Sequence, residues 1–475
     1  MYAKLNKKKI PTLQLIALVL VLFQYLVTIN DSKNYTSFLA LEMLFIYGCL
    51  LVTALKKRGL FDLYSLLLCT MGLFSFGEIV FSFFDPSVNY RISSIGYELT
   101  FKEETVQNAM LIYSAYLLAL DIGIVLYEKR GRNDNVFGVP FDLDVYRAGK
   151  MLMILFLAFA FYRAFVQFQI LNSNRLLLFQ GGSAGLDVPF YLRITSTFFL
   201  YGYYIFTASR PPLKQFIVAT IVYVLVQIPD LLIGNRMALG VLFLYVLWMS
   251  VIVYGVKINV KKLALPLVAV IVVFQYIGMS RLDMDTSGIG VIGMVLKFLT
   301  MQATSFGLLC AYIQYTPNIS GPYPFVLDSL IGGLTGYSGQ TEEVLAHRSS
   351  IGHQLVYEIS PEYYFSGSSS GTSCVSELYE FGILGVIIGA ILFAFLVCFF
   401  QKYFSNSRLL LLFSCSIFAI VIMSPRAGMF LPLYEIIRTL VFVWVAFKGY
   451  KLISGRSIHL SKWIKSLVKQ SNVIK

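Results

Sequence analysis

Residues 376–400 read SELYEFGILGVIIGAILFAFLVCFF, and this stretch decides the class of fold. From residue 382 onward it carries no charged side chain. About 20 apolar residues suffice for an α-helix to cross the roughly 30 Å of hydrocarbon in a bilayer. Within that layer the backbone must satisfy its own hydrogen bonds, so such a run folds as a helix. The stretch therefore predicts a membrane-spanning helix.

Runs of this kind fill most of the 475-residue chain, which is 57% hydrophobic and only 13% charged. A soluble protein carries about 25% charged residues. Besides 376–400, stretches of spanning length lie near 11–29, 37–55, 60–84, 106–127, 151–171, 189–208, 214–233, 237–255, 262–279, 291–313, 409–423 and 430–448. The sequence therefore predicts an all-α polytopic membrane protein with about 12–14 transmembrane helices, built as one integral membrane domain over residues 1–475.

The positions of the basic residues predict the topology. Of 38 Lys and Arg, 26 lie at the termini or in connections on the same side, 8 on the other side and 4 within spans. Cytoplasmic segments carry the excess of Lys and Arg, so both termini are expected in the cytoplasm. The formal charge of +13 then reflects topology, aided by anionic lipid, and no nucleic acid is expected as a partner. No small-residue cleavage site follows the first apolar run, which is expected to be a retained span.

The segment 314–375 is the one long non-membrane stretch. If 291–313 crossed the membrane alone, this segment would fall on the cytoplasmic side and the later charge pattern would break. We therefore expect 291–313 to be a re-entrant or interfacial helix, or a span paired with the short run 323–335. Either arrangement makes 314–375 a long periplasmic loop, and loops of this length are usually functional.

Several motifs are absent from the sequence. A GxxxxGK[ST] phosphate loop and an HExxH motif are both missing, which argues against ATP-driven transport and a zinc protease. The six cysteines form no CxxC pair, so neither a zinc site nor a disulfide framework is expected. Asp283-Met284-Asp285 has the spacing of a metal-binding pair, but a solvated outer loop is the better interpretation. No metal and no cofactor are expected.

Three arginines are expected on the outer side, where the positive-inside rule disfavours them: Arg236, Arg281 and Arg426. Guanidinium is the side chain best shaped to grip phosphate through paired donors. A cluster of such arginines at the membrane surface would suit a lipid-linked pyrophosphate. Alternatively, each arginine caps a helix C-terminus or pairs with a nearby carboxylate.

The run GTSCVSELYEFGILG, residues 371–385, places small polar residues before a helix whose first turn carries Glu377. Ser373 is expected as the N-cap, with Ser376 in the first turn. The later glycines permit close helix contacts. Capping alone would explain the helix start but not its position at the end of a long outer loop. Farther along, Glu435 and Arg438 are expected to form an intrahelical pair.

These patches resemble the O-antigen and capsular polysaccharide polymerases, the Wzy family. Three features carry the resemblance in the family's order: the turn 234–236 (Gly-Asn-Arg) that opens a span, the run 371–385 after a large outer loop, and the turn 424–428 (Ser-Pro-Arg-Ala-Gly) before the last span. The architecture is similar over the whole chain, whereas the shared motifs are confined to these patches.

The resemblance implies glycosyl transfer between oligosaccharide repeat units carried on undecaprenyl pyrophosphate, at the periplasmic face of the bacterial inner membrane. The growing chain on one carrier passes to the non-reducing end of a new unit on another. The family is related to the C-type membrane glycosyltransferases, and the reaction is expected to be metal-independent. A chain-length regulator is a hypothetical protein partner that rests on the resemblance alone.

The implied chemistry assigns roles to particular residues. Arg236, Arg281 and Arg426 are expected to stabilise the departing pyrophosphate. The candidates for the general base that accepts the acceptor hydroxyl's proton are Glu377, His353 and Glu343. Aromatic side chains are expected to stack on sugar rings or to anchor the loop at the interface, and those expected to bind sugar are Tyr357, Tyr363 and Tyr379.

Two other functions compete with polymerisation. An O-antigen ligase performs the same chemistry on a different acceptor, and sequence patterns separate the two poorly. A flippase that carries the lipid-linked unit across the membrane belongs to a different class. A transporter is expected to show paired halves or interrupted helices at mid-membrane, and no such symmetry is evident in the sequence.

Overall fold

The computed structural model describes residues 11–28, 35–85, 88–93, 99–129, 138–173, 188–232, 236–281, 290–367 and 370–471. Helices dominate these residues, and one short antiparallel pair joins β1 (Ile92–Ser93) to β2 (Leu99–Thr100). The longer elements are α1 (Thr12–Thr28), α2 (Thr36–Arg58), α3 (Leu63–Met71), the π-helical turn η1 (Gly72–Phe76), α4 (Gly77–Ser82), α5 (Glu103–Lys129), α6 (Leu143–Ser173), α8 (Phe190–Ala208), α9 (Leu213–Leu232), α10 (Arg236–Ile252), α11 (Val260–Arg281), α12 (Val291–Gln302), α13 (Ser305–Tyr315), α19 (Gly382–Tyr403), α20 (Arg408–Leu412), α21 (Ser414–Met423), α22 (Leu433–Ser454) and α23 (Leu460–Ser471).

Within the described residues, six helices are long and apolar enough to cross a membrane by length and composition, and six shorter apolar helices accompany them. This confirms the predicted all-α polytopic class. The six long segments are Thr36–Arg58, Leu63–Ser82, Glu103–Glu128, Leu143–Ile170, Val291–Asn318 and Gly382–Asn406. Because these criteria are length and composition, the predicted total of about 12–14 crossings stays a prediction.

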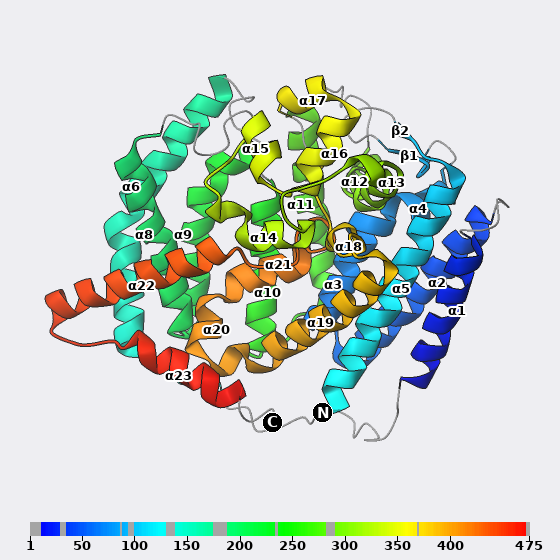
Figure 1. Cartoon of the computed structure of the whole chain (residues 1–475). Helices are drawn as coiled ribbons and strands as arrows, with labels where there is room; N and C mark the ends of the chain where they lie inside the picture. Colours follow the sequence, from blue (N-terminus) through cyan, green and yellow to red (C-terminus); the bar gives the residue numbers. More distant parts are fainter. Residues whose placement is uncertain are drawn as a thin grey trace.

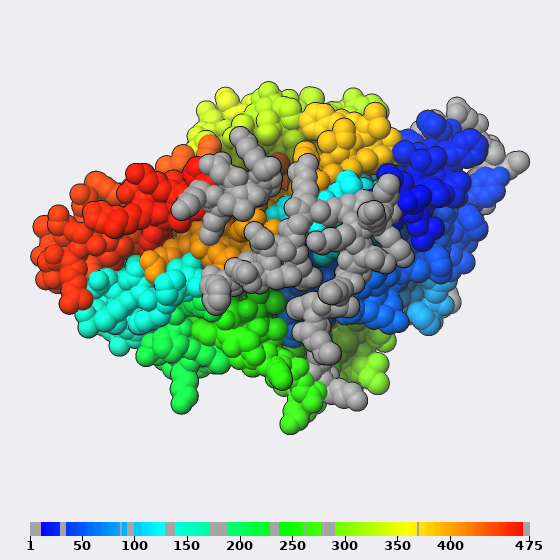
Figure 2. Space-filling model, turned by 90° about the horizontal axis from the view of Figure 1, so that it is seen from below, coloured from blue at the N-terminus to red at the C-terminus, as the bar shows by residue number. Residues whose placement is uncertain are grey.

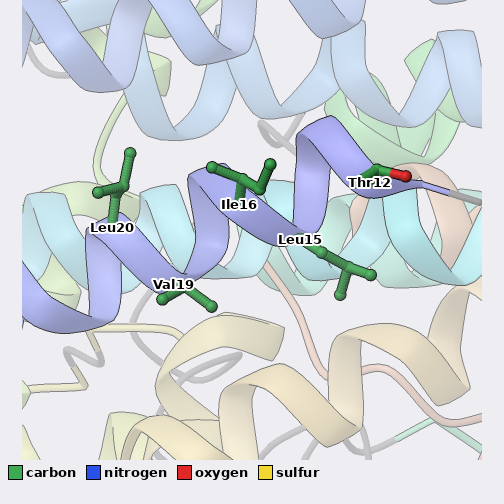
Figure 3. Close-up of a pocket in the computed structure, with 5 residues that line it drawn as sticks. All are labelled: Thr12, Leu15, Ile16, Val19 and Leu20. Carbon is green, nitrogen blue, oxygen red and sulfur yellow. The ribbon is translucent and has the colours of Figure 1, made fainter.

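The outer surface of the bundle is apolar, as a surface in contact with lipid tails should be. On α1, the side chains of Leu15, Ile16, Val19 and Leu20 are 41–64% exposed. Figure 3 shows these four apolar side chains along α1, with Thr12 at its start. A soluble monomer rarely exposes a continuous apolar strip of this kind, so α1 is suited to face hydrocarbon.

Helix α5 forms the centre of the packing, and most of its apolar window is buried. It packs against α1, α2 and α19. Gly123 permits the close approach of α19, because a Cβ atom there would lie 2.7 Å from the Cβ of Ala394. Helices α6 and α8 make the most extensive pairing, and Gly149 and Gly202 lie where their backbones meet.

The predicted long loop folds as a series of short helices, which we call the loop helices: η3 (Thr316–Asn318), η4 (Phe325–Leu327), α14 (Asp328–Ile331), η5 (Gly332–Leu334), α15 (Glu342–His347), α16 (Ile351–Ile359) and α17 (Pro361–Phe365). They are followed by α18 (Cys374–Tyr379). In Figure 1, α15, α16 and α17 lie at the upper end of the molecule with β1 and β2, and α23 lies at the lower end. Figure 2, seen from below, shows α1 and α2 in blue at one edge and α22 and α23 in red at the other.

The stretch 291–313 is interrupted, since α12 ends at Gln302 and α13 begins at Ser305. Helix α12 packs against α11 and α4, whereas α13 packs against α5 and α16. A broken helix fits the expected re-entrant or interfacial arrangement, and its length and composition also permit a crossing. Its relation to the bilayer therefore stays a prediction.

Replacing Gly149 with Ala is expected to destabilise the α6–α8 pair. The new Cβ would lie 2.5 Å from the backbone nitrogen of Phe206, so the helices must separate. Overpacking of this kind costs about 1–3 kcal/mol. The measurement is the thermal unfolding midpoint of the detergent-solubilised protein. Gly449→Ala on α22 is the matched control, since its Cβ meets nothing within 4 Å. Equal midpoints for both variants would contradict the assigned packing.

Candidate functional site

The start of α18 is built as the sequence predicted. Ser373 is the N-cap: its Oγ accepts a hydrogen bond from the backbone nitrogen of Ser376 at 3.1 Å, and the two hydroxyl groups lie 2.7 Å apart. The expected continuous helix 376–400 is nevertheless broken, because α18 ends at Tyr379 and α19 begins at Gly382 with φ +67°. Since Ser376 completes the cap, the side chain of Glu377 is left for other contacts.

Glu377 is only 3% exposed. Its Oε1 accepts a hydrogen bond from Thr372 Oγ1 at 3.4 Å, and the backbone N–H of Met429 also stabilises the carboxylate. Among the described residues, Oε2 has no hydrogen-bond partner. Burial raises the pKa of this carboxyl well above its usual range, because the charged form is poorly solvated. Glu377 precedes the spanning segment, which begins at Gly382.

The turn 424–428 lies directly against α18. The backbone nitrogen of Cys374 donates to the carbonyl oxygen of Ser424 at 2.9 Å. A Cβ added at Gly428 would lie 2.9 Å from Glu377 Oε1, so only glycine leaves room for the carboxyl there. The two motifs that the sequence analysis singled out are therefore in contact.

Arg426, in the same turn, extends towards the broken helix α12–α13. Its guanidinium donates a hydrogen bond to Gln302, the last residue of α12. It also lies 5.6 Å from the ring centroid of Phe74 in the π-helical turn η1, a cation–π contact. Turns of this type are frequent at functional sites. Arg426 is partly exposed, and its charge is held in place at this point of the fold.

A second carboxyl group lies near Glu377 and was missed by the sequence analysis. Asp328, at the start of α14, is 8% exposed and pairs with Arg348 at 2.8 Å. Tyr323 Oη donates to Asp328 Oδ1 at 2.7 Å. The negative charge of Asp328 contributes to raising the pKa of Glu377. Asp328 is thus neutralised and hydrogen-bonded, whereas Glu377 keeps an unpaired oxygen.

Glu380 holds the start of the loop helices against α18. Its Oε2 accepts a hydrogen bond from the backbone nitrogen of Phe325 at 2.7 Å, and the N–H of Val326 also contributes. This contact fixes η4 and α14, and with them Ser329, which lies against Gly428. In Figure 1, α14, α18 and α21 meet at mid-height, beneath the helices α15, α16 and α17.

The other two proposed bases lie in different surroundings. His353 on α16 is half-buried, and its Nδ1 lies 3.1 Å from the hydroxyl of Tyr364. Burial, with the positive charge of Arg348, lowers the pKa of His353 to about 4. Glu343 is exposed on α15.

The three predicted sugar-binding tyrosines do not form one group. Tyr357 is 37% exposed and packs edge-on against Tyr364. Tyr363 is on α17 and partly exposed. The hydroxyl of Tyr379 lies 3.2 Å from that of Tyr25 on α1, and its side chain also packs against the cluster of Tyr312, Phe325 and Ile351. The sugar-binding role of all three stays a prediction.

Two predicted arginines fall at helix ends: Arg236 begins α10 and Arg281 ends α11. The structure does not describe the side chains of these two arginines, so the approach of Arg236 and Arg281 to Arg426 stays a prediction. Asp283 and Asp285 also lie outside the described residues.

The predicted pair of Glu435 and Arg438 is present, and Arg438 also donates a hydrogen bond to Tyr201 at 2.9 Å. Within the described ranges, no group of three or more His, Cys, Asp or Glu could hold a metal ion.

The chain was compared with known protein families, curated proteins and solved structures. The family model described as O-antigen polysaccharide polymerase Wzy matches residues 12–451, nearly the whole chain. No curated protein and no solved structure matches the chain.

Acidification is expected to destabilise the loop helices through His353. Its folded pKa of about 4 lies below the usual 6.5, so between these values the unfolded chain binds a proton that the folded chain does not. Stability therefore falls as the pH is lowered through this window. His353→Gln should show a smaller loss of thermal unfolding midpoint between pH 7 and pH 5 than the parent protein. An equal loss would mean that His353 is not shielded as described.

Proposed function

Because the chain belongs to the O-antigen polysaccharide polymerase Wzy family, we propose that it joins undecaprenyl-pyrophosphate-linked repeat units at the periplasmic face of the inner membrane. Membership of this family implies a glycosyltransferase-type polymerase, and the apolar helices fit a multi-pass membrane protein. The substrate carrier, the side of the membrane and the cytoplasmic location of both termini belong to the proposal. So do metal independence and a chain-length regulator as partner.

One observation supports a glycosyl-transfer site most strongly. The buried carboxyl of Glu377, with its unpaired Oε2, lies against the turn that carries Arg426. An unsatisfied buried polar atom costs about 1–3 kcal/mol, and among the described residues Glu377 is the one carboxyl group that carries such an atom. Transfer from a pyrophosphate leaving group requires a proton acceptor and a fixed positive charge, and the turn 424–428 contacts the first and carries the second.

The proposed reaction needs one proton transfer and one displacement. The acceptor hydroxyl of the new repeat unit gives its proton to Glu377 Oε2, and its oxygen forms a bond to the anomeric carbon of the growing chain. The bond from that carbon to the pyrophosphate oxygen breaks, and undecaprenyl pyrophosphate leaves with the electron pair. Arg426, with Arg236 and Arg281 as the other expected donors, stabilises the departing negative charge.

Glu377 is favoured over the other two candidate bases by its surroundings. Burial raises its pKa well above that of a solvated carboxyl, so its carboxylate form is a stronger base than one exposed to water. The lowered pKa of His353 makes it a weak base, and its ring already contacts Tyr364. Glu343 is exposed on α15, and no burial holds its carboxyl against the turn 424–428. Tyr357, Tyr363 and Tyr379 remain the proposed sugar contacts.

Access to Glu377 requires the loop helices to move. The carboxyl is covered on one side by Gly428 and Ser329, and the segment around Ser329 is held by Glu380. A bound sugar must therefore open the contact between α14 and α18. Asp328 begins α14, and its partner Arg348 directly follows α15. This ion pair therefore links the two helices, so we expect the pair to move together with α14.

Replacing Glu377 with Gln is expected to reduce the surface polysaccharide ladder to a single repeat unit in the native host. Gln keeps the volume but cannot take the proton, and loss of a general base typically costs about 100- to 10,000-fold in rate. Arg426→Gln should give the same pattern, because the leaving group loses its fixed charge. The measurement is gel electrophoresis of the polysaccharide from a deletion strain complemented at normal expression level.

The exposed Glu343→Gln is the matched control and should restore the full ladder. A ladder lost with Glu343→Gln but kept with Glu377→Gln would contradict the assigned base. The deletion strain separates the rival functions. A capped single unit means that export and ligation survive, as a polymerase requires. Loss of even the single unit would favour a flippase or a ligase.

A further inference from the structure

The C-terminal segment is strongly basic, and the proposed reaction assigns no role to its charges. Residues 448–475 carry seven Lys or Arg and no Asp or Glu. The segment includes the end of α22, a short connection and α23. Figure 1 shows α23 folding back beneath α20, at the end of the molecule opposite α15, α16 and α17.

One side of α23 is fixed to the protein. Trp463 is 5% exposed. Its ring packs edge-on against that of Phe447 on α22, with 5.3 Å between the two ring centroids. Helix α23 also packs against α20. The connection before it is held by Arg456, whose guanidinium pairs with Asp144 at the start of α6. Helix α23 is therefore held in place by the contacts of one of its sides with α20 and α22, and by the ion pair in the connection that precedes it.

The rest of α23 is divided between apolar and basic side chains. Ile464 and Val468 are 42% and 55% exposed, next to the face that carries Trp463. Lys462 and Lys465 are exposed, and their spacing of three residues places them on the same side of the helix. Exposed apolar side chains beside a row of lysines are the pattern of a helix lying in a membrane interface.

We propose that α23 is an interfacial helix that binds the headgroups of anionic phospholipids through Lys462 and Lys465, while Ile464 and Val468 enter the boundary of the acyl chains. Charge complementarity identifies the occupant, because the segment offers only positive charge to a partner surface. Continuity with α22 supplies the second argument: the end of α22, which leads into α23 through a short connection, exposes Leu452 and Ile453 by 88% and 72%.

The test compares amide hydrogen exchange of residues 457–468 in the full-length protein, reconstituted in nanodiscs of phosphatidylcholine with and without phosphatidylglycerol. Exchange is expected to be slower with phosphatidylglycerol by on the order of 10-fold, from two lysines near an anionic surface. Lys462→Glu with Lys465→Glu should remove this difference. Ile464→Ser with Val468→Ser should speed exchange in both lipid compositions.

The matched control is Lys214→Glu with Lys257→Glu, which makes the same charge change at two exposed lysines outside α23. This control should keep the dependence on phosphatidylglycerol. Equal exchange of the parent protein in both compositions would overturn the proposal and leave α23 as a helix that packs on the protein alone. Loss of the dependence in the control as well would show a general effect of net charge and would also overturn it.

Discussion

A buried carboxyl with one unpaired oxygen is the constraint on which the candidate site depends. Keeping Glu377 at 3% exposure requires neighbours that leave it room, and Gly428, capped α18 and the segment at Ser329 provide this. Each neighbour is itself fixed: the turn 424–428 by the backbone bond from Cys374, and the η4–α14 segment by Glu380. Because these contacts join three separate parts of the chain, the site exists only when these three parts are packed together.

The class of fold followed from the sequence because the bilayer allows few solutions. Apolar runs such as 382–400 must become helices, since unpaired backbone groups are too costly in hydrocarbon. Local features were also predictable: the Ser373 cap and the Glu435–Arg438 pair each depend on residues three positions apart. The family match over residues 12–451 agrees with the resemblance carried by the motif patches.

The contacts that build the site were less predictable because they are distant in sequence. Asp328 lay inside an apolar run, and nothing local marked Arg348 as its partner. Arg426 meets Gln302 across more than a hundred residues. The break between α18 and α19 could have been suspected from Gly382, which adopts a positive φ that glycine tolerates best. Hydrophobicity alone favoured a continuous helix there.

We propose that this site transfers a glycan from a pyrophosphate-linked carrier, with Glu377 taking the proton. The most direct measurement incubates the purified protein with an undecaprenyl-pyrophosphate-linked repeat unit and quantifies glycan length and released carrier together. We expect products of two or more units with one carrier pyrophosphate released per bond, and neither product with Glu377→Gln despite retained substrate binding. Carrier release or chain growth that persists in Glu377→Gln would contradict the proposal.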